Sequence, residues 1–360
     1  MKTPRSILIV GAGLAGSRCA ETLRNEGFDG RIVVVGDEPM PPYERPALSK
    51  EFLAGERPAE SLALRPDSFW PEHQIELVVG RRVVTVGQRP RVARTDRGDA
   101  FEWEALVIAT GARARRLPFA SPPGVHVLRT AADAAALRAE LEPGRHLAVV
   151  GGGFVGAEVA STARGLGVEV TMLEAGPAPF AGLLGAEVGS ALVARYRQHG
   201  VDLRTNTQAT AFSTAPSGRL RAVVLDEGAE VACDAALVAV GVEAETGLAG
   251  PAVPPIHVCG DAAGGAGHWT SAAASGASTA RVLLGLEPLP PAPSFFWSDQ
   301  FGLRLQLVGS PRGSTVVELD GSGERFTARY RAANGRLVAA LTANRPEEIA
   351  SLRRELAFAA

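Results

Sequence analysis

Two segments of the chain, about 140 residues apart, share one pattern of apolar and glycine residues. Each begins with an apolar run typical of a buried strand, at residues 7–10 and 147–150. A glycine-rich turn follows, then an alanine-rich helical pattern, then a second apolar run at 31–36 or 168–173. The pattern predicts two strand–helix–strand units with parallel strands.

The glycines of both turns follow the order Gly-x-Gly-x-x-Gly. The first glycine makes the tight turn, the second lets backbone approach a pyrophosphate, and the third allows close helix–strand packing. The pyrophosphate then rests on the helix N-terminus. One copy is weak evidence, but two copies in the same context predict two dinucleotide sites. The predicted binding residues are Gly11, Gly13, Leu14, Ala15 and Gly16 in the first turn, and Gly151, Gly153, Phe154, Val155 and Gly156 in the second.

An acidic residue follows the second strand of each unit, where a carboxylate can bind ribose hydroxyls. Asp37 and Glu38 follow the first pair of strands, and Glu174 follows the second. No Arg or Lys occurs after Glu174 until Arg195, so nothing nearby would favour a 2′-phosphate. The second site is therefore predicted to prefer NADH.

The remaining pattern predicts an α/β chain with a small α+β module at its end. A proline-rich loop at 39–50 leads to a short helix at 50–54, which Ser49 is expected to cap. Residues 75–104 suggest a small antiparallel crossover. Further buried strands are predicted at 106–111, 236–241 and 256–261. An antiparallel meander is predicted from strands at 201–205, 208–213, 220–226 and 229–233. Helices are predicted at 131–141, 187–199 and 271–284.

Residues 286–293 have the composition of a linker. After it, strands are predicted at 303–308, 315–319, 325–330 and 336–341, and a helix at 346–357.

Composition narrows the class of protein. The chain has 360 residues, enough for two or three domains, and a net charge of −2 that argues against general nucleic-acid binding. No apolar run approaches the roughly 20 residues of a membrane helix, and the N-terminus lacks a signal-peptide pattern. A cytoplasmic protein is predicted.

Cysteine and lysine usage bear on the chemistry. Cys19, Cys233 and Cys259 form no CxxC or CxxxxC pair, so a redox dithiol is not expected, and no cluster has metal-ligand spacing. Of 37 basic residues only Lys2 and Lys50 are lysine, which hints that Lys50 serves a need for a compact ammonium group.

More specific motifs accompany the glycine turns. They are Val-Gly-Asp-Glu at 35–38, Tyr-Glu-Arg-Pro-Ala-Leu-Ser-Lys at 43–50, Ala-Thr-Gly at 109–111, Gly-Ala-Glu at 156–158, Gly-Asp at 260–261, His-Trp-Thr at 268–270 and Phe-Trp-Ser-Asp-Gln at 296–300. In this order the chain resembles, over nearly its whole length, the FAD-dependent NADH:ferredoxin reductases of bacterial oxygenase and cytochrome P450 systems. The resemblance implies the glutathione-reductase fold without its redox disulfide.

The resemblance also implies roles for particular residues. The first unit would hold FAD and the second NADH, with FAD-binding segments at 1–112 and 241–290, an NADH-binding domain at 113–240 and a C-terminal interface domain at 294–360. Lys50 would lie near flavin N5, paired with Glu158, which positions the nicotinamide. These two are the expected catalytic residues, with a solvated ion pair as the alternative. Further contacts implied for FAD are Arg45, Ala109, Thr110, Gly111, Asp261, Trp269, Thr270 and Trp297, and for NADH Gly241.

Core packing is the alternative for either tryptophan. The resemblance also implies that the chain is shortened, relative to the family, at 243–255 and at its C-terminal end.

The expected function is transfer of a hydride from NADH to FAD and of single electrons onward to a ferredoxin-type iron–sulfur protein. Two alternatives remain at this stage. One is an NADH oxidase, flavin-reducing or tailoring flavoenzyme without a ferredoxin, and the other is an FAD-carrying interaction protein. The oligomeric state stays open between monomer and dimer.

Overall fold

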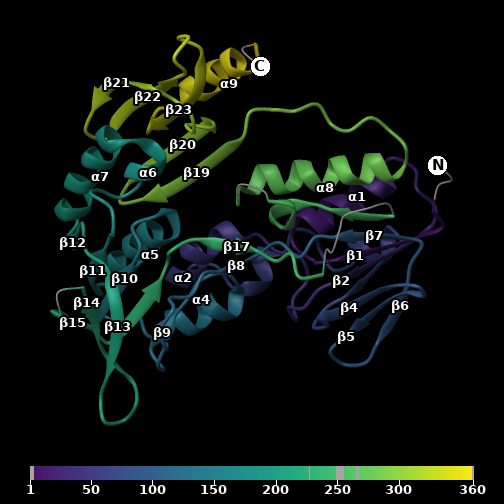
Figure 1. Cartoon of the computed structure of the whole chain (residues 1–360), viewed down its shortest axis with the longest axis horizontal. Coiled ribbons are helices and arrows are strands. Elements are labelled where there is room, and N and C mark those ends of the chain that lie inside the picture. The colour runs from purple at the N-terminus through teal and green to yellow at the C-terminus, as the bar shows by residue number, and fades with distance from the viewer. Residues whose placement is uncertain (1–3, 227, 249–254, 265–266, 359–360) are drawn as a thin grey trace. The chain divides into compact units, whose positions relative to one another are not determined.

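A computed structural model of the chain describes residues 4–226, 228–248, 255–264 and 267–358 (Figure 1). The chain divides into two compact units. Unit 1 comprises Met1–Glu44, Ala59–Arg113 and Val242–Pro291, and unit 2 comprises Arg45–Pro58, Ala114–Gly241 and Ala292–Ala360. The predicted α/β class with two Rossmann-like units and a small terminal α+β module is confirmed.

Unit 1 is built on a five-stranded parallel sheet with the order β18-β7-β1-β2-β3. Its strands are β1 (Ser6–Val10), β2 (Arg31–Val35), β3 (Ile75–Val78), β7 (Ala105–Ile108) and β18 (Ile256–Val258). Helices α1 (Leu14–Asn25) and α8 (Trp269–Leu283) lie side by side on one face (Figure 1). The antiparallel strands β4 (Val83–Gln88), β5 (Arg91–Thr95) and β6 (Ala100–Glu102) pack against the other face.

The two faces explain why the first strand is apolar without interruption. Ile7 and Ile9 point into the core shared with the helices, whereas Leu8 and Val10 point into the core shared with the antiparallel strands. A strand that is covered on both sides has no polar face. The expected crossover at 75–104 is therefore only partly right, because β3 joins the parallel sheet.

Shorter elements complete unit 1. They are η2 (Ala59–Leu62), α3 (Phe69–Glu72), β8 (Ala112–Ala114), β17 (Val242–Ala244) and η3 (Gly260–Ala263), with β8 and β17 paired where the chain passes between the units.

Unit 2 repeats the parallel plan with the sheet order β12-β11-β10-β16-β9. Its strands are β9 (Val125–His126), β10 (His146–Val150), β11 (Glu169–Leu173), β12 (Val201–Arg204) and β16 (Ala235–Val238). Helices of this unit include η1 (Arg45–Ser49), α2 (Glu51–Ala54), α4 (Ala131–Arg138), α5 (Phe154–Gly165), α6 (Ala181–Leu184) and α7 (Ala186–Gln198). A separate antiparallel sheet is formed by β13 (Ala209–Thr214), β14 (Leu220–Leu225) and β15 (Glu230–Ala232).

The predicted four-stranded meander is wrong in its first strand. β12 pairs in parallel with β11, and only the three later strands form the antiparallel sheet. The residues of β12 alternate between buried Val201 and Leu203 and exposed neighbours, as in a half-buried meander strand. Here the alternation arises because β12 is the edge strand of the parallel sheet.

The end of the chain forms an antiparallel sheet in unit 2 with the order β19-β20-β23-β22-β21. Its strands are β19 (Phe295–Gln300), β20 (Leu303–Gly309), β21 (Val316–Ser322), β22 (Arg325–Arg331) and β23 (Leu337–Ala343), followed by η4 (Pro346–Glu348) and α9 (Ile349–Phe358). Ile349, Leu352 and Leu356 pack α9 against Val308 and Leu337 of the sheet. Strand β19 is absent from the sequence prediction, which placed a motif there but no strand.

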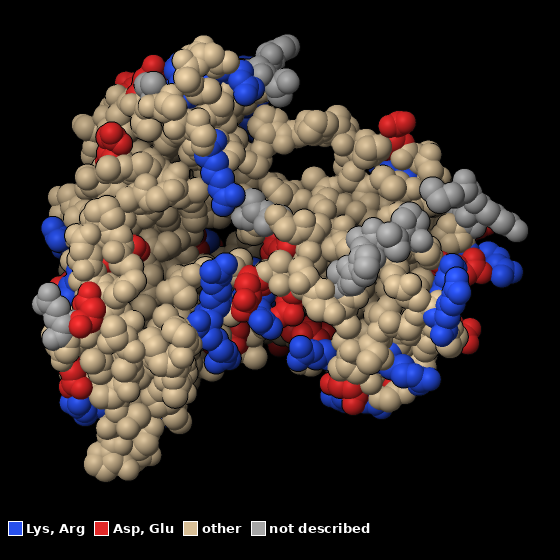
Figure 2. All heavy atoms as spheres, viewed as in Figure 1, with Lys and Arg blue, Asp and Glu red and all other residues tan. Residues whose placement is uncertain are grey.

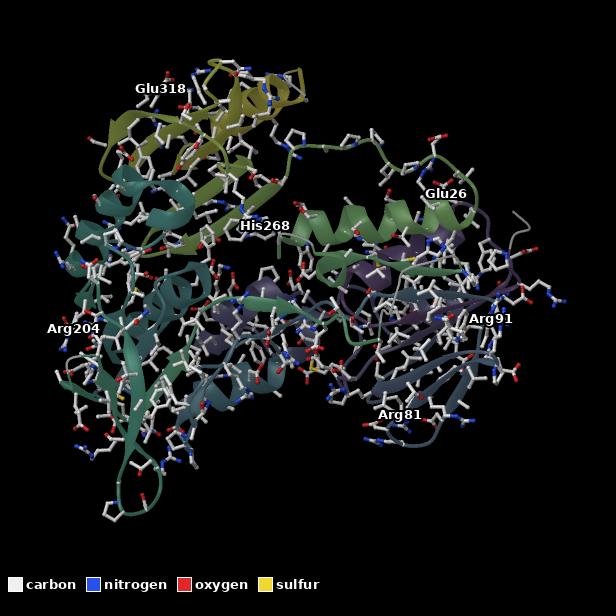
Figure 3. All side chains as sticks on the ribbon, viewed as in Figure 1. Glu26, Arg81, Arg91, Arg204, His268 and Glu318 are labelled. Carbon is white, nitrogen blue, oxygen red and sulfur yellow. The ribbon has the colours of Figure 1, made fainter. Side chains whose placement is uncertain are left out.

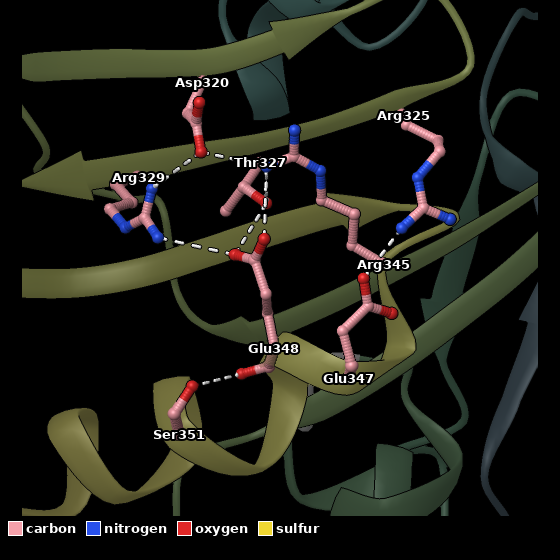
Figure 4. Close-up of polar contacts among 8 residues, drawn as sticks. All are labelled: Asp320, Arg325, Thr327, Arg329, Arg345, Glu347, Glu348 and Ser351. Atoms are coloured by element: carbon pink, nitrogen blue, oxygen red, sulfur yellow. Dashed lines mark hydrogen bonds and ion pairs between the residues drawn. The ribbon is translucent and has the colours of Figure 1, made fainter.

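A polar network also joins this helical end to the sheet (Figure 4). The Glu348 carboxylate accepts hydrogen bonds from Thr327 Oγ1 at 2.9 Å and Arg345 Nη1 at 3.1 Å. Arg345 Nη1 also lies 2.9 Å from Asp320 Oδ2. Arg345 donates to both carboxylates. Its positive charge therefore offsets the repulsion between Asp320 on β21 and Glu348 in η4.

No helix among the described residues is long and apolar enough to cross a membrane. On the face seen in Figure 2, basic and acidic side chains are interspersed and do not gather into one patch of a single sign.

Packing of α1 on α8 depends on a glycine. A Cβ built on Gly276 of α8 would collide with the backbone carbonyl of Ala15 in α1. A backbone atom cannot rotate away as a flexible side chain can, so any side chain at 276 must separate the two helices.

We therefore expect Gly276→Ala to lower the free energy of unfolding by about 1–3 kcal/mol, the usual cost of overpacking a core. The measurement is denaturant unfolding of the FAD-loaded protein. Gly165→Ala is the control, because a Cβ on this exposed helical glycine meets no atom within 4 Å. A Gly276→Ala protein as stable as wild type would contradict this account of the α1–α8 contact.

Candidate active site

The first glycine turn joins β1 to α1 with the geometry that a bound pyrophosphate needs. Gly11 has φ +117°, which L side chains rarely adopt, and a Cβ there would collide with the carbonyl of Ala109. A Cβ on Gly13 would meet nothing within 4 Å, so this position faces open space. The N-cap residue of α1 is Gly13, which has no side chain to cap the first turn. The N–H groups at the start of a helix can bind an anion.

The second turn, between β10 and α5, has the same geometry. Gly151 has φ +108°, and a Cβ there would lie 2.5 Å from the carbonyl oxygen of Ala239. Gly153 faces open space, and no side chain caps α5. In both copies the first glycine donates its N–H to the end of the neighbouring strand, Gly11 to Val35 and Gly151 to Leu173, each at 2.8 Å. The two fingerprints therefore fit the same chemical group.

The acids that follow the two turns are not equivalent. Gly36 and Glu174 occupy matching positions, because each is the residue after the strand bonded to the turn glycine. Glu174 accepts hydrogen bonds from Gly152 N at 2.8 Å and Gly176 N at 2.7 Å. The first copy has glycine at that position. Its acids come later, with Asp37 exposed and Glu38 accepting a hydrogen bond from Tyr43 at 2.6 Å.

A cavity of about 560 Å³ opens in unit 2 beside the second turn. It is lined by the glycines at 151–153, by Glu174, by Phe119 and by Gly241, all of which belong to unit 2. Of the eight residues predicted for NADH, four line this cavity: Gly151, Gly153, Glu174 and Gly241. Phe154, Val155, Gly156 and Glu158 are not in its lining. Phe119, Leu117 and Gln208 also line it and were missed, because no motif marks them.

The described lining of this cavity contains no basic residue. The neighbouring strand ends at Arg204 (Figure 3), but that guanidinium donates to Asp202 through Nε at 2.9 Å and Nη2 at 2.8 Å. An arginine already paired with a carboxylate is a poor partner for a 2′-phosphate. The arrangement agrees with a preference for NADH.

Lys50 and Glu158 form the expected pair. Lys50 Nζ lies 2.9 Å from Glu158 Oε2, and the side chains are only 13% and 7% exposed. Lys50 also donates to the carbonyl oxygen of Pro46 at 3.0 Å. The alternative of a solvated pair is therefore wrong, since both charged groups are largely withdrawn from water.

Two serines complete the coordination of Glu158. Ser49 Oγ donates to Oε2 at 2.5 Å, and Ser298 Oγ donates to Oε1 at 2.7 Å. The expected cap by Ser49 is therefore wrong: α2 (Glu51–Ala54) has Lys50 at its N-cap, preceded by η1 (Arg45–Ser49), and receives no side-chain cap. The hydroxyl is used in a contact 109 residues away in sequence.

The predicted FAD residues fall in both units. In unit 1 the carboxyl ends of β1, β7 and β18 bring together Gly11, Ala109 and Gly260, with Asp261 following in η3. Thr110 Oγ1 donates to the carbonyl of Glu245 at 2.6 Å. The remaining residues are Gly111, with φ +75°, Trp269 and Thr270 in the first turn of α8, and, in unit 2, Arg45, Lys50 and Trp297.

Arg45 Nη1 donates to the carbonyl of Arg129 at 2.6 Å. Trp297 is half-buried and stacks on Phe295 with ring centroids 6.1 Å apart. Phe154, the predicted NADH residue that opens α5, packs against Phe180 and Phe296 at 4.5 and 4.2 Å, whereas Val155 is exposed. Contact of any of these side chains with a cofactor stays a prediction.

The three cysteines are free and buried. Burial raises the pKa of Cys233 and of Cys259 to about 12, and it raises the pKa of Cys19 well above its ordinary value. A thiol that stays protonated is a weak nucleophile.

The fold, with two parallel sheets that each carry a glycine turn and an uncapped helix, is that of a two-dinucleotide oxidoreductase. The family model for pyridine nucleotide-disulphide oxidoreductases matches residues 5–253, and the model for the reductase C-terminal domain matches residues 295–360.

Individual relatives agree. The ferredoxin–NAD(+) reductase component of the p-cumate 2,3-dioxygenase system of Pseudomonas putida is 38% identical, over 97% of this chain and 92% of that protein. The structure of putidaredoxin reductase in its covalent complex with putidaredoxin matches with a TM-score of 0.93 and 30% identity, over 98% of this chain and 93% of that one. The ferredoxin reductase of the CYP199A2 system of Rhodopseudomonas palustris matches with a TM-score of 0.88 and 32% identity, over 94% and 91% of the chains.

The chain belongs to the pyridine nucleotide-disulphide oxidoreductases, in their ferredoxin reductase branch, whose members use FAD and NADH. The resemblance noted from the motifs is confirmed. The alignment with the p-cumate relative extends over 378 residues, more than the 360 of this chain, so gaps open in this chain. That a gap lies at 243–255 stays a prediction; residues 249–254 are outside the described part of the chain.

Native protein should resist thiol reagents. Because all three thiols are buried and remain protonated at neutral pH, we expect none of them to react with a chromogenic disulfide reagent in the folded, FAD-loaded protein. Three equivalents should react after unfolding in guanidinium. A thiol that reacts rapidly in the native protein would contradict the burial described here.

Cofactor choice should depend on Glu174. Glu174→Arg removes the acceptor of two backbone N–H groups and supplies a cation for a 2′-phosphate. We expect the ratio of kcat/KM for NADPH to that for NADH to rise by about tenfold or more, which is about 1.4 kcal/mol. Steady-state kinetics with each nucleotide measures the ratio. Glu169→Arg, at the exposed opposite end of the same strand, should leave it unchanged. An unaltered ratio in Glu174→Arg would refute the assignment of the cavity to the ribose.

Proposed function

We propose that this protein is an NADH:ferredoxin oxidoreductase that holds FAD in unit 1 and admits NADH to the cavity of unit 2. One NADH and one proton would reduce FAD to FADH₂ and release NAD⁺. Two ferredoxin-type iron–sulfur proteins would then each take one electron, and two protons would return to solvent as FAD is restored. The flavin supplies the step from two-electron to one-electron chemistry. The names of the relatives, which serve dioxygenase and cytochrome P450 systems, support this class of acceptor.

The observation that carries the proposal is the buried Lys50–Glu158 pair. Glu158 lies on the helix that begins at the second glycine turn, so the carboxylate is fixed relative to the predicted nucleotide cradle. The Lys50 ammonium, held by Glu158 and the Pro46 carbonyl, is a largely buried positive charge that the protein keeps in place. A fixed cation favours negative charge that develops on a hydride acceptor. We propose Lys50 and Glu158 as the catalytic residues.

The two glycine turns are proposed as the pyrophosphate sites of FAD and NADH. Asp261 and the start of α8 are proposed to contact FAD, as the family resemblance implies. A cytoplasmic location stays a prediction from the sequence, as does the division into functional domains.

The proposal is tested by anaerobic stopped-flow spectroscopy of the FAD-loaded protein. We expect NADH to bleach the flavin absorbance and a ferredoxin from an oxygenase system to restore it with reduction of the cluster. A flavin that stays oxidised over minutes would overturn the proposal and favour an FAD-carrying interaction protein. Rapid NADH consumption by oxygen, unaffected by any ferredoxin in a panel, would instead favour an NADH oxidase.

Lys50→Met serves as the variant of this test. Loss of a fixed charge at the reacting centre should slow flavin reduction by about tenfold to a hundredfold while FAD remains bound. Lys50→Arg keeps the charge and should retain more of the rate. Full activity in Lys50→Met would remove this residue from the reaction.

A further inference from the structure

Behind Glu158 lies a chain of buried polar groups, two of which, Ser298 and Gln300, belong to the Phe-Trp-Ser-Asp-Gln motif at 296–300. Gln300 Nε2 donates to Ser298 Oγ at 3.0 Å, and Tyr196 donates its hydroxyl to Gln300 Oε1. Ser298 and Tyr196 are 0% exposed and Gln300 is 2% exposed. The chain thus runs from α7 through strand β19 to the carboxylate on α5, entirely within unit 2.

The hydrogen bonds in this chain have one direction. A carboxylate can only accept, so the single proton of Ser298 points to Glu158 Oε1. The lone pair of Ser298 then accepts from the Gln300 amide, whose own oxygen accepts from Tyr196. Burial, and next the charge of Glu158, raise the pKa of Tyr196 well above its ordinary value, so this phenol keeps the proton that it donates. The direction of each hydrogen bond thus sets the direction of the next, and the series ends at the carboxylate of Glu158.

The two oxygens of Glu158 therefore have separate partners. Oε2 receives Lys50 at 2.9 Å and Ser49 at 2.5 Å, whereas Oε1 receives Ser298 at 2.7 Å. Rotation about the Cγ–Cδ bond moves both oxygens together, so the plane of the carboxylate is held from both sides, by Lys50 and Ser49 at Oε2 and by Ser298 at Oε1. Loss of the Ser298 hydroxyl would remove the contact on the Oε1 side and leave the plane held from the Oε2 side alone.

We propose that Ser298, supported by Gln300 and Tyr196, is a positioning residue that orients Glu158 for hydride transfer. The inference rests on the proposed function, in which Glu158 helps to place the nicotinamide. It assigns strand β19, in the C-terminal sheet, a part in the reaction with NADH.

Ser298→Ala in the FAD-loaded full-length protein is the first test. We expect the limiting rate of flavin reduction at saturating NADH to fall by about tenfold to a hundredfold, as misplacement of a reacting group by about 1 Å can do. The NADH dissociation constant should change by less than about threefold, because the cavity around Glu174 holds the rest of the nucleotide. Ser298→Thr, which keeps the hydroxyl, should recover most of the rate.

Thr342→Val is the matched control. Thr342 is a buried hydroxyl residue of β23 in the same sheet, and its Oγ1 has no hydrogen-bond partner among the residues that the structure describes. Its replacement by an isosteric apolar side chain should leave both constants unchanged.

A double-mutant cycle with Glu158→Gln distinguishes positioning from general support. If Ser298 acts through Glu158, Ser298→Ala should slow the Glu158→Gln protein by less than about twofold. An equal slowing in both backgrounds, or a Ser298→Ala protein as fast as wild type, would overturn the inference. Tyr196→Phe removes only the outer hydroxyl and gives the same cycle should Ser298→Ala not fold.

The same double-mutant cycle can be measured on denaturant unfolding midpoints. It then reports the interaction between Ser298 and Glu158 without depending on turnover. Wild-type protein that NADH does not reduce, together with coupled unfolding midpoints, would mean that the proposed function fails while the contact stands. Normal reduction of wild type with additive effects on the rate would mean that the positioning role fails while the proposed function stands.

Discussion

A buried carboxylate has to be satisfied, and this requirement determines how unit 2 is assembled. Withdrawing an ionised carboxylate from water costs several kcal/mol unless a counter-charge and hydrogen bonds replace the solvent. Glu158 obtains these from Ser49 and Lys50 in one segment and from Ser298 in another. Residues 45–58 thus belong to unit 2, although the segments on both sides of them in the sequence belong to unit 1.

The same requirement explains why the pair is not merely a surface contact. An exposed Lys–Glu pair contributes little to stability and tolerates loose geometry. Here each member has further partners, since Lys50 also donates to the Pro46 carbonyl and Glu158 also accepts from Ser49 and Ser298. In addition, Thr162 Oγ1 of α5 donates to the Ser49 carbonyl at 2.8 Å. The backbone of the segment that carries Lys50 is therefore attached to α5 at Ser49, the residue before the lysine. A point charge held in this way keeps its position when a ligand arrives, which is the property that electrostatic catalysis requires.

Local patterns in the sequence were sufficient for both glycine turns. A strand–turn–helix unit is defined within about 30 residues, and apolar runs and glycine spacing are local signals. The errors have the opposite origin. Ser49 looked like a helix cap because its bond to Glu158, 109 residues away, leaves no local trace. The Ser298–Glu158 and Tyr196–Gln300 contacts span 140 and 104 residues. The Phe-Trp-Ser-Asp-Gln motif at 296–300 marked Ser298 and Gln300, but nothing near them in the sequence indicated these partners.

The family model takes its name from a disulphide, yet the three cysteines of this chain are free and buried. Cys233 lies in unit 2, whereas Cys19 and Cys259 lie in the core of unit 1 between its sheet and helices. None is exposed, and burial raises the pKa of each thiol. In a reductase with a redox dithiol, electron pairs leave the flavin through sulfur. The relatives named above are ferredoxin and putidaredoxin reductases. An acceptor of single electrons suits a flavin, which can release its two electrons one at a time.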